Sequence, residues 1–260
     1  MNLVGLELND SALAAVGDRG LLFSEPGYAI ERDGIAVFGD AARKFLRLSP
    51  RRIASRYWEA LAEQALPRPL GGCRTEADLV HAHLQRLWEQ AGGEADGAVL
   101  AVPGHWTVAQ LGLLLGIAQE QAINVRGLVD LAVAATRQEY VGGLLLHLDI
   151  SLHHATVSRM GQQGKVTVED RYVIAGAGVE RLERVCVELI ARQFVDASRF
   201  DPLLEAETEQ YLYDHLPRWL AGLNDRNRLS LAVPYRGNEF SATLDRAALL
   251  DALGRACEPV

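Results

Sequence analysis

The sequence predicts an α/β fold in which strand hairpins alternate with amphipathic helices. Residues 4–16 (V-G-L-E-L-N-D-S-A-L-A-A-V) form two short apolar runs joined at Asn9-Asp10, and these residues tolerate a tight turn. G-A-V-L-A-V-P at 97–103 is a continuous apolar run bounded by glycine and proline, typical of a buried strand. Thr75 and Asp78 have the spacing of a capping box, which predicts a helix start.

The elements expected in the first half follow from turn residues and apolar spacing. Proline pushes the preceding residue out of the helical region, so the helix expected before Ser49-Pro50 ends there. The expected elements are a strand at 21–24, a helix over 41–48, a helix over 51–67, the helix from Thr75 to Gly92-Gly93, a helix over 108–121, a strand at 124–128 and a helix over 130–140.

The second half is expected to continue as a hairpin, two helices, a hairpin and a helix. Asp245 is a good N-cap residue for the last helix. The expected elements are a strand from Leu144 paired with 155–160 and with 166–173, a helix after 175–178, a helix after Pro202 kinked at Pro217, strands at 228–233 and 239–244, and the final helix.

Composition limits the possible partners. The chain has 260 residues, enough for one large or two small domains, and its net charge is −8. Nucleic-acid and anionic-membrane surfaces need clustered Lys and Arg, so neither partner is expected. The basic residues within 43–56 are interpreted as a solvated face. Three scattered cysteines and the absence of a signal-peptide pattern or a long apolar run predict a cytoplasmic protein.

The strand at 144–160 alternates leucine with polar residues, which places His147, Asp149, Ser151 and His153 on one face. This face could be a metal site completed by His154, a hydrolase site using Ser151, or a polar strand edge in a cleft. A turn between Ile150 and His154 would remove His153 from it. No G-x-S-x-G motif accompanies Ser151, and a metal site is not expected. His105 is interpreted as a surface residue, and Trp106 as a packing residue.

Several segments, in this order, resemble the nucleotide-binding domain of the heat-shock-protein 70 kDa (DnaK-like) chaperones of the actin-like ATPase superfamily. V-G-L-E-L-N-D-S resembles the first phosphate hairpin, G-I-D-L-G-T-T-N-S. A-V-L-A-V-P-G-H-W-T-V-A-Q at 98–110 is similar to A-V-I-T-V-P-A-Y-F-x-x-x-Q, the most specific match. The other similar segments are F-G-D-A-A-R at 38–43, N-V-R-G-L-V-D-L-A-V-A-A at 124–135, the strand at 144–160 in place of the second phosphate motif, A-G-A-G at 175–178, and A-T-L-D-R-A-A-L-L-D-A-L near the end.

The resemblance implies a ribonuclease-H-like actin/heat-shock-70 ATPase fold with two lobes. Lobe I would be complete and cover 1–143, with an inserted subdomain near 25–95. Lobe II would be partial and cover 144–260, with a base at 144–195 and an upper subdomain at 196–260. The second half of that lobe, which carries the adenosine-binding motif in the family, is not matched.

The resemblance also implies a nucleotide site for ATP or ADP with magnesium. Asp130 aligns with the glutamate that orients the attacking water, and Arg56 lies near the position of the family's lysine. Glu7 and His154 take the places of two magnesium-side aspartates, and His147 takes the place of the aspartate in the second phosphate motif. The residues expected at the nucleotide are Glu7, Asn9, Asp10, Ser11, Asp149, Ser151, Gly176 and Gly178.

The phosphate motifs depart from the family pattern in ways that predict weak or lost ATPase activity. Asn9, Asp10 and Ser11 replace G-T-T, and Asp149, Ile150 and Ser151 replace three glycines. Glycine reaches positive φ and lets backbone N–H groups approach phosphate, whereas β-branched Ile150 disfavours positive φ and the aspartates repel phosphate. The expected function is a divergent, chaperone-related protein-interaction or regulatory module with protein partners or clients. The alternative is an ATP-binding chaperone ATPase with unconventional phosphate contacts.

Overall fold

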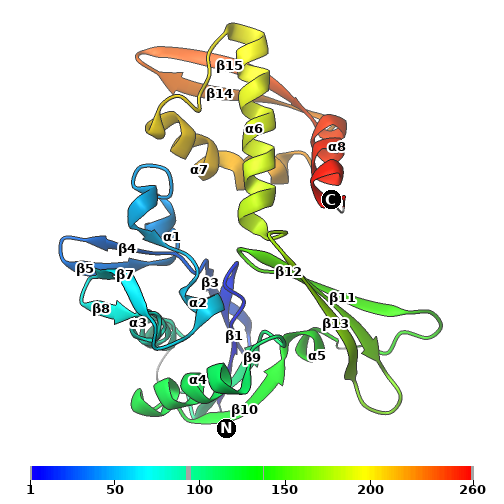
Figure 1. Cartoon of the computed structure of the whole chain (residues 1–260). Helices are drawn as coiled ribbons and strands as arrows, with labels where there is room; N and C mark the ends of the chain where they lie inside the picture. The colour runs from blue at the N-terminus through cyan, green and yellow to red at the C-terminus, as the bar shows by residue number, and fades with distance from the viewer. Residues whose placement is uncertain (1, 92–94, 137, 259–260) are drawn as a thin grey trace. The chain divides into compact units, whose positions relative to one another are not determined.

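The computed structural model describes residues 2–91, 95–136 and 138–258, and the chain divides into two compact units. Unit 1 comprises residues 1–43 and 52–176, and unit 2 comprises residues 44–51 and 177–260. The fold class is mixed α/β with several sheets (Figure 1). The units separate at Gly176, whereas the resemblance implies a lobe boundary at residue 143.

Unit 1 is built around a five-stranded sheet with the order β10-β9-β1-β2-β3. β1 pairs in parallel with β9 and antiparallel with β2, so the N-terminal hairpin is joined to a parallel layer. The strands are β1 (Leu3–Glu7), β2 (Leu13–Gly17), β3 (Gly20–Glu25), β9 (Gly97–Val102) and β10 (Val125–Asp130). The hairpin expected around Asn9-Asp10 and the buried strand expected at 97–103 are therefore confirmed.

One face of this sheet carries the core of unit 1. Val4, Leu6 and Leu8 alternate along the chain and are buried, together with side chains of α3 (Glu76–Gln90) and α4 (Val108–Glu120). Thr75 caps α3 with the predicted capping box: its side chain accepts the N–H of Asp78. The end of this helix expected at Gly92-Gly93 lies outside the described residues. A second capping box at Thr107 starts α4.

The segment between β3 and α3 contains more strand than the sequence predicts. The helix expected over 51–67 is wrong, because only α2 (Tyr57–Ala60) is helical and Leu61 then leaves the helical region with φ of 20°. Two prolines follow in β7, and proline is unsuited to a helix interior. The helix expected over 41–48 is likewise only α1 (Gly39–Arg43). The remaining elements are β4 (Ala29–Arg32), β5 (Ile35–Phe38), the 3₁₀ helix Pro50–Arg52, β6 (Ile53–Ala54), β7 (Ala65–Leu70) and β8 (Cys73–Thr75).

A second sheet completes unit 1, with β12 in the centre and β11 and β13 on either side. The strands are β11 (Leu145–Ile150), β12 (His154–Gly161) and β13 (Thr167–Ala175), and both pairings are antiparallel. The pairing of β11 with β12 is as predicted, whereas the pairing expected between the strand from Leu144 and 166–173 is wrong, because β13 pairs with β12. The short helix α5 (Leu131–Ala135) packs against all three strands (Figure 1). The helix expected over 130–140 therefore ends five residues early, at Ala135.

Unit 2 contains three helices and one hairpin among its described residues: α6 (Val179–Ser198), α7 (Ala206–Gly222), β14 (Arg228–Tyr235), β15 (Asn238–Asp245) and α8 (Arg246–Cys257). Asp245 caps α8 as predicted by accepting the N–H of Ala247. The segment 44–51 is held on α7, because Arg47 donates its backbone N–H to Gln210 Oε1 at 2.7 Å and its guanidinium lies over the ring of Tyr213. None of the described helices has the length and apolar character needed to cross a membrane.

Candidate functional site

Two turns of unit 1, about 140 residues apart in sequence, are hydrogen-bonded to each other. The first connects β1 to β2, and the second connects β11 to β12. Asn9 Nδ2 donates to Asp149 Oδ1 at 2.6 Å and to the carbonyl oxygen of Ile150 at 3.3 Å. Ser11 Oγ donates to the same carbonyl oxygen at 2.8 Å. Four of the residues expected at a nucleotide (Asn9, Asp10, Ser11 and Asp149) are thus brought together.

Asp10 forms the most buried link between the turns. Its Oδ1 accepts the backbone N–H of Leu152 at 2.7 Å, and the side chain is only 4% exposed. Burial raises the pKa of the Asp10 carboxyl to about 6, although the Leu152 N–H opposes this shift. We refer to the bonds that Asn9, Asp10 and Ser11 make with Asp149, Ile150 and Leu152 as the turn–turn contact.

The turn–turn contact uses backbone N–H groups that a phosphate-binding turn would present to its ligand. Leu152 N–H donates to Asp10, Ser11 N–H to Asn9 Oδ1 at 2.9 Å, and Ser151 N–H to the carbonyl oxygen of His154 at 2.9 Å. None of the described residues 9–11 and 149–153 has a positive φ. The turns therefore close without the left-handed conformations that the family's glycines provide, and Ile150 is unstrained at the end of β11.

Glu7 and Asp149 lie near each other on a groove of about 330 Å³ beside the turns, and His147 lines the same groove. Burial raises the pKa of Glu7, and the charge of Asp149 raises it further, while His147 lowers it. Burial also raises the pKa of Asp149, against the effects of His147 and of the hydrogen bond from Asn9. The rest of the groove is lined mainly by small and aliphatic side chains of β1, β2, β9, β10 and α5.

Asp130, expected to orient a water, has both carboxylate oxygens engaged by protein groups. As the N-cap of α5, it accepts the N–H of Ala132 at 2.9 Å through Oδ1, while Oδ2 accepts from Arg171 Nη2 at 2.5 Å. Arg171 also donates to Ser158 Oγ at 3.2 Å and to the carbonyl oxygen of Gly104. This places Asp130 in a structural ion pair. Arg171 carries no local sequence signal beyond its place in an expected strand.

The remaining expected residues lie around these turns or outside unit 1. Ser151 is buried within the second turn at 2% exposed, so its hydroxyl is not presented to a substrate. Gly176 ends unit 1 with φ of 71°, and its N–H donates to the carbonyl oxygen of His153. Gly178 is the N-cap of α6 and belongs to unit 2. Arg56 is exposed and pairs with Glu59 at 2.8 Å.

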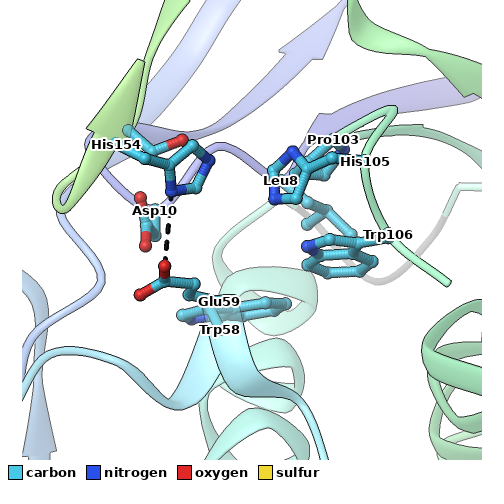
Figure 2. A pocket seen from close by; sticks show the side chains of 9 residues that line it. Leu8, Asp10, Trp58, Glu59, Pro103, His105, Trp106 and His154 are labelled. Atoms are coloured by element: carbon cyan, nitrogen blue, oxygen red, sulfur yellow. Dashed lines mark ion pairs between the residues drawn. The ribbon is translucent and has the colours of Figure 1, made fainter. Parts of the chain in front are cut away.

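A small cavity under the turns is lined by the expected residues Asp10 and His154, and also by Glu59 and His105, which no sequence motif assigned to the site (Figure 2). His154 Nδ1 faces Glu59 Oε1 at 3.5 Å, and the His154 ring lies edge-on to His105 with centroids 4.4 Å apart. His105 is therefore half-buried, and its interpretation as a surface residue is wrong. Burial, followed by the charges of His154 and Arg171, lowers the pKa of His105 to about 4. Trp106 is buried at 7% exposed, as expected for a packing residue.

The volume in which the centre of a water molecule can lie is about 10 Å³. The cavity therefore has room for roughly one water. Asp10 Oδ2, His154 Nε2 and His105 Nε2 are buried without a hydrogen-bond partner among the described residues. One water between such groups would satisfy several of them, since buried polar atoms are nearly always hydrogen-bonded. A phosphate group is too large for this space.

The metal-site interpretation of the 144–160 strand receives no geometric support. A turn does fall between Ile150 and His154, so His153 leaves the face of His147 and Asp149, and its Nε2 lies 2.9 Å from the carbonyl oxygen of Ser55. Within the described ranges, no three His, Cys, Asp or Glu side chains are placed to share a metal ion. No protein-family model matches the chain, and no curated protein matches it either.

Proposed function

We propose that this protein is a divergent heat-shock-70-like module whose two phosphate turns bind each other instead of a nucleotide. Its role would be protein interaction or regulation in a chaperone-related process. The sequence motifs support the scaffold, because the segments similar to the two phosphate hairpins form turns that lie together. The strand order β10-β9-β1-β2-β3, with a hairpin joined to parallel strands, is compatible with a ribonuclease-H-like lobe.

The observation that carries this proposal is the bond from Leu152 N–H to Asp10 Oδ1. The Leu152 N–H already donates to a carboxylate oxygen of the protein, so it is not available to donate to a phosphate oxygen. A phosphate would have to displace this carboxylate and the Asn9 and Ser11 bonds, each worth about 1 kcal/mol or more. Glu7 and Asp149 lie close by, and ionised carboxylates repel a polyphosphate. The residues present therefore do not fit a bound ATP or ADP with the turns in this arrangement.

One observation favours the alternative, a nucleotide-binding protein with unconventional contacts. Glu7 and Asp149 both line the 330 Å³ groove, and carboxylate oxygens are the ligands that Mg²⁺ prefers. A magnesium–nucleotide complex could use them only if the turn–turn contact opened, because Asp149 accepts a hydrogen bond from Asn9. Asp130 would still be held by Arg171 and Ala132, so a hydrolytic water would lack this residue as its orienting base.

Calorimetric titration with magnesium-ATP and magnesium-ADP tests the proposal. Wild-type protein is expected to give no binding heat up to about 1 mM nucleotide, an affinity weaker than roughly −4 kcal/mol. A second titration uses Asp10→Gly, which frees the Leu152 N–H, and a third uses Asp18→Gly in the exposed β2–β3 turn as the matched control. Micromolar binding by the wild type would overturn the proposal. Binding by Asp10→Gly alone would support it, because it would show that Asp10 occupies the phosphate position.

A further inference from the structure

The face of the five-stranded sheet opposite the core carries the groove of about 330 Å³. Glu7 alternates along β1 with the buried residues Leu6 and Leu8, so its side chain lies on this opposite face. α5 contacts strands of both sheets of unit 1 and forms one wall of the groove, and β11 contributes His147 and Asp149. All of these elements belong to unit 1, so the groove is a feature of one compact unit.

The size and the walls of the groove suit a small organic molecule. Its volume lies in the range of about 300–1,000 Å³ that is typical of small-molecule sites, which are mostly apolar with a few polar groups that orient the ligand. Among the described residues that line the groove, none is Lys or Arg. The apolar walls are formed by Val16, Val99, Ala101, Val129, Leu131 and Ala134.

Two carboxylates at the groove carry negative charge that protein groups compensate only in part. The Glu7 carboxylate makes no hydrogen bond or ion pair with another described residue. Asp149 accepts a hydrogen bond from the uncharged amide of Asn9, at Oδ1. Burial raises the pKa of both carboxyls, and the charge of Asp149 raises that of Glu7 further, while His147 opposes both shifts. A cation bound near both carboxylates would relieve this repulsion.

The chemistry of the groove favours an organic cation over a metal ion or an anion. Within the part of the chain that the structure describes, Glu7, Asp149 and His147 are not placed to share a metal ion. An ammonium group makes no such demand on geometry, because its three N–H donors rotate to meet the acceptors that are present. An alkyl chain attached to it would cover the apolar walls. A phosphate or carboxylate ligand would be repelled by both carboxylates.

We propose that this groove binds a small aliphatic amine in its ammonium form. The ammonium group would lie at the carboxylates of Glu7 and Asp149, and the alkyl chain would lie against the valine and alanine side chains of the sheet and of α5. Asn9 donates to Oδ1 of Asp149, so Oδ2 can accept from the ligand while the turn–turn contact stays closed. The inference does not depend on whether the turns bind nucleotide.

Protein NMR titration with n-pentylammonium chloride tests this inference, with 1-pentanol as the uncharged ligand of similar shape. About 150 mM NaCl is present to screen weak attraction to exposed carboxylates. The amides of β1, α5 and β11 are expected to shift and to saturate with a dissociation constant of about 1 mM or below. The affinity for 1-pentanol is expected to be at least about tenfold weaker, because it cannot form charge-assisted bonds with both carboxylates.

Three variants locate the ammonium group. Glu7→Gln and Asp149→Asn each remove one charge and keep the shape of the side chain, and the asparagine retains an oxygen that can accept from Asn9. Each should weaken the affinity for pentylammonium at least about tenfold and leave that for 1-pentanol unchanged. Glu239→Gln, at an exposed carboxyl in unit 2, is the matched control and should bind like the wild type. The amide spectrum of each variant shows whether it is folded.

Four results would overturn the inference. The first is the absence of saturable shifts at about 10 mM pentylammonium. The second is a set of shifts spread over exposed carboxylates of both units, which would show general attraction to a chain with a net charge of −8. The third is equal affinity for 1-pentanol, or unchanged affinity in both Glu7→Gln and Asp149→Asn. The fourth is displacement of pentylammonium by about 5 mM magnesium chloride, which would assign the carboxylates to a metal ion.

Discussion

Replacing Asp10 with asparagine is expected to stabilise the protein at neutral pH. The buried carboxyl has its pKa raised from 3.8 to about 6, mainly by burial. The folded state therefore binds a proton more tightly than the unfolded state. Stability contributed by the protonated group is present below pH 4 and is lost as the pH rises through about 6. At pH 7 the ionised carboxylate costs about 3 kcal/mol, since each pKa unit corresponds to about 1.4 kcal/mol.

Asp10→Asn retains a side-chain oxygen that can accept the Leu152 N–H, and it removes the buried charge. Urea unfolding at pH 7.5 should show the variant to be more stable than the wild type by about 2–3 kcal/mol. The difference should shrink to less than about 0.5 kcal/mol at pH 4, where the wild-type carboxyl is also protonated. Exposed Asp18→Asn is the control and should change the unfolding free energy by less than about 0.5 kcal/mol at either pH.

A wild type more stable than Asp10→Asn at pH 7.5 would refute this reasoning, because the charge-assisted bond to Leu152 would then outweigh the cost of burial. A difference that does not change between pH 4 and pH 7.5 would refute it equally, because proton binding would then not be involved. The expected result would mean that the protein retains a destabilising charge at the turn–turn contact. Charges kept at a cost in stability are typical of positions selected for function.

Two further predictions concern one buried and one half-buried polar group of unit 1, His83 and Arg171. His83 is fully buried, and its Nε2 lies 3.0 Å from Glu25 Oε1. His83→Ala should therefore lower the unfolding free energy by about 3–5 kcal/mol in urea titrations. A loss below about 1 kcal/mol would contradict a stabilising role of the His83–Glu25 pair. Arg171→Met removes the partner of Asp130 and should cost about 2–4 kcal/mol, whereas Arg159→Met, in an exposed ion pair, should cost less than about 1 kcal/mol. Equal losses in the two arginine variants would show that the Asp130 pair is not structural.

Local sequence signals predicted individual elements well where a side chain forms a hydrogen bond with a backbone group a few residues away. The capping box at Thr75, the N-cap at Asp245 and the turn at Asn9-Asp10 are all confirmed, because each depends on residues within a few positions. The helix expected over 51–67 failed for the opposite reason. Its apolar spacing reflects burial of Tyr57 and Trp58 in the core, which a four-residue helix achieves.

The candidate site could be predicted only in part. Resemblance placed Asn9, Asp10, Ser11 and Asp149 in two turns, and the structure brings these turns together. The partner of each side chain could not be predicted, because Asp10 and Leu152 are separated by 142 residues and no local pattern links them. Asp130 was expected to face a water, and its ion pair with Arg171 arises from the packing of α5 against β13.

The alternation of polar and apolar residues in β11 correctly predicted which side chains share a face. Which of the two faces is turned inward depends on the rest of unit 1. His147 and Asp149 share one face, as predicted, and that face is turned inward. Amphipathic strands normally bury their apolar side, so a polar inward face could not be expected from the sequence of the strand alone. The neighbouring polar residues Asn9, Asp130 and Arg171 make this arrangement possible.

The backbone amide of Leu152 provides the most direct test that the two turns bind each other. Amide hydrogen exchange measured by NMR should show this N–H protected in the wild type and unchanged by about 1 mM magnesium-ATP. The protection should fall at least about tenfold in Asp10→Ala, which removes the acceptor. An unprotected Leu152 amide in the wild type, or a resonance that shifts when nucleotide is added, would contradict the account.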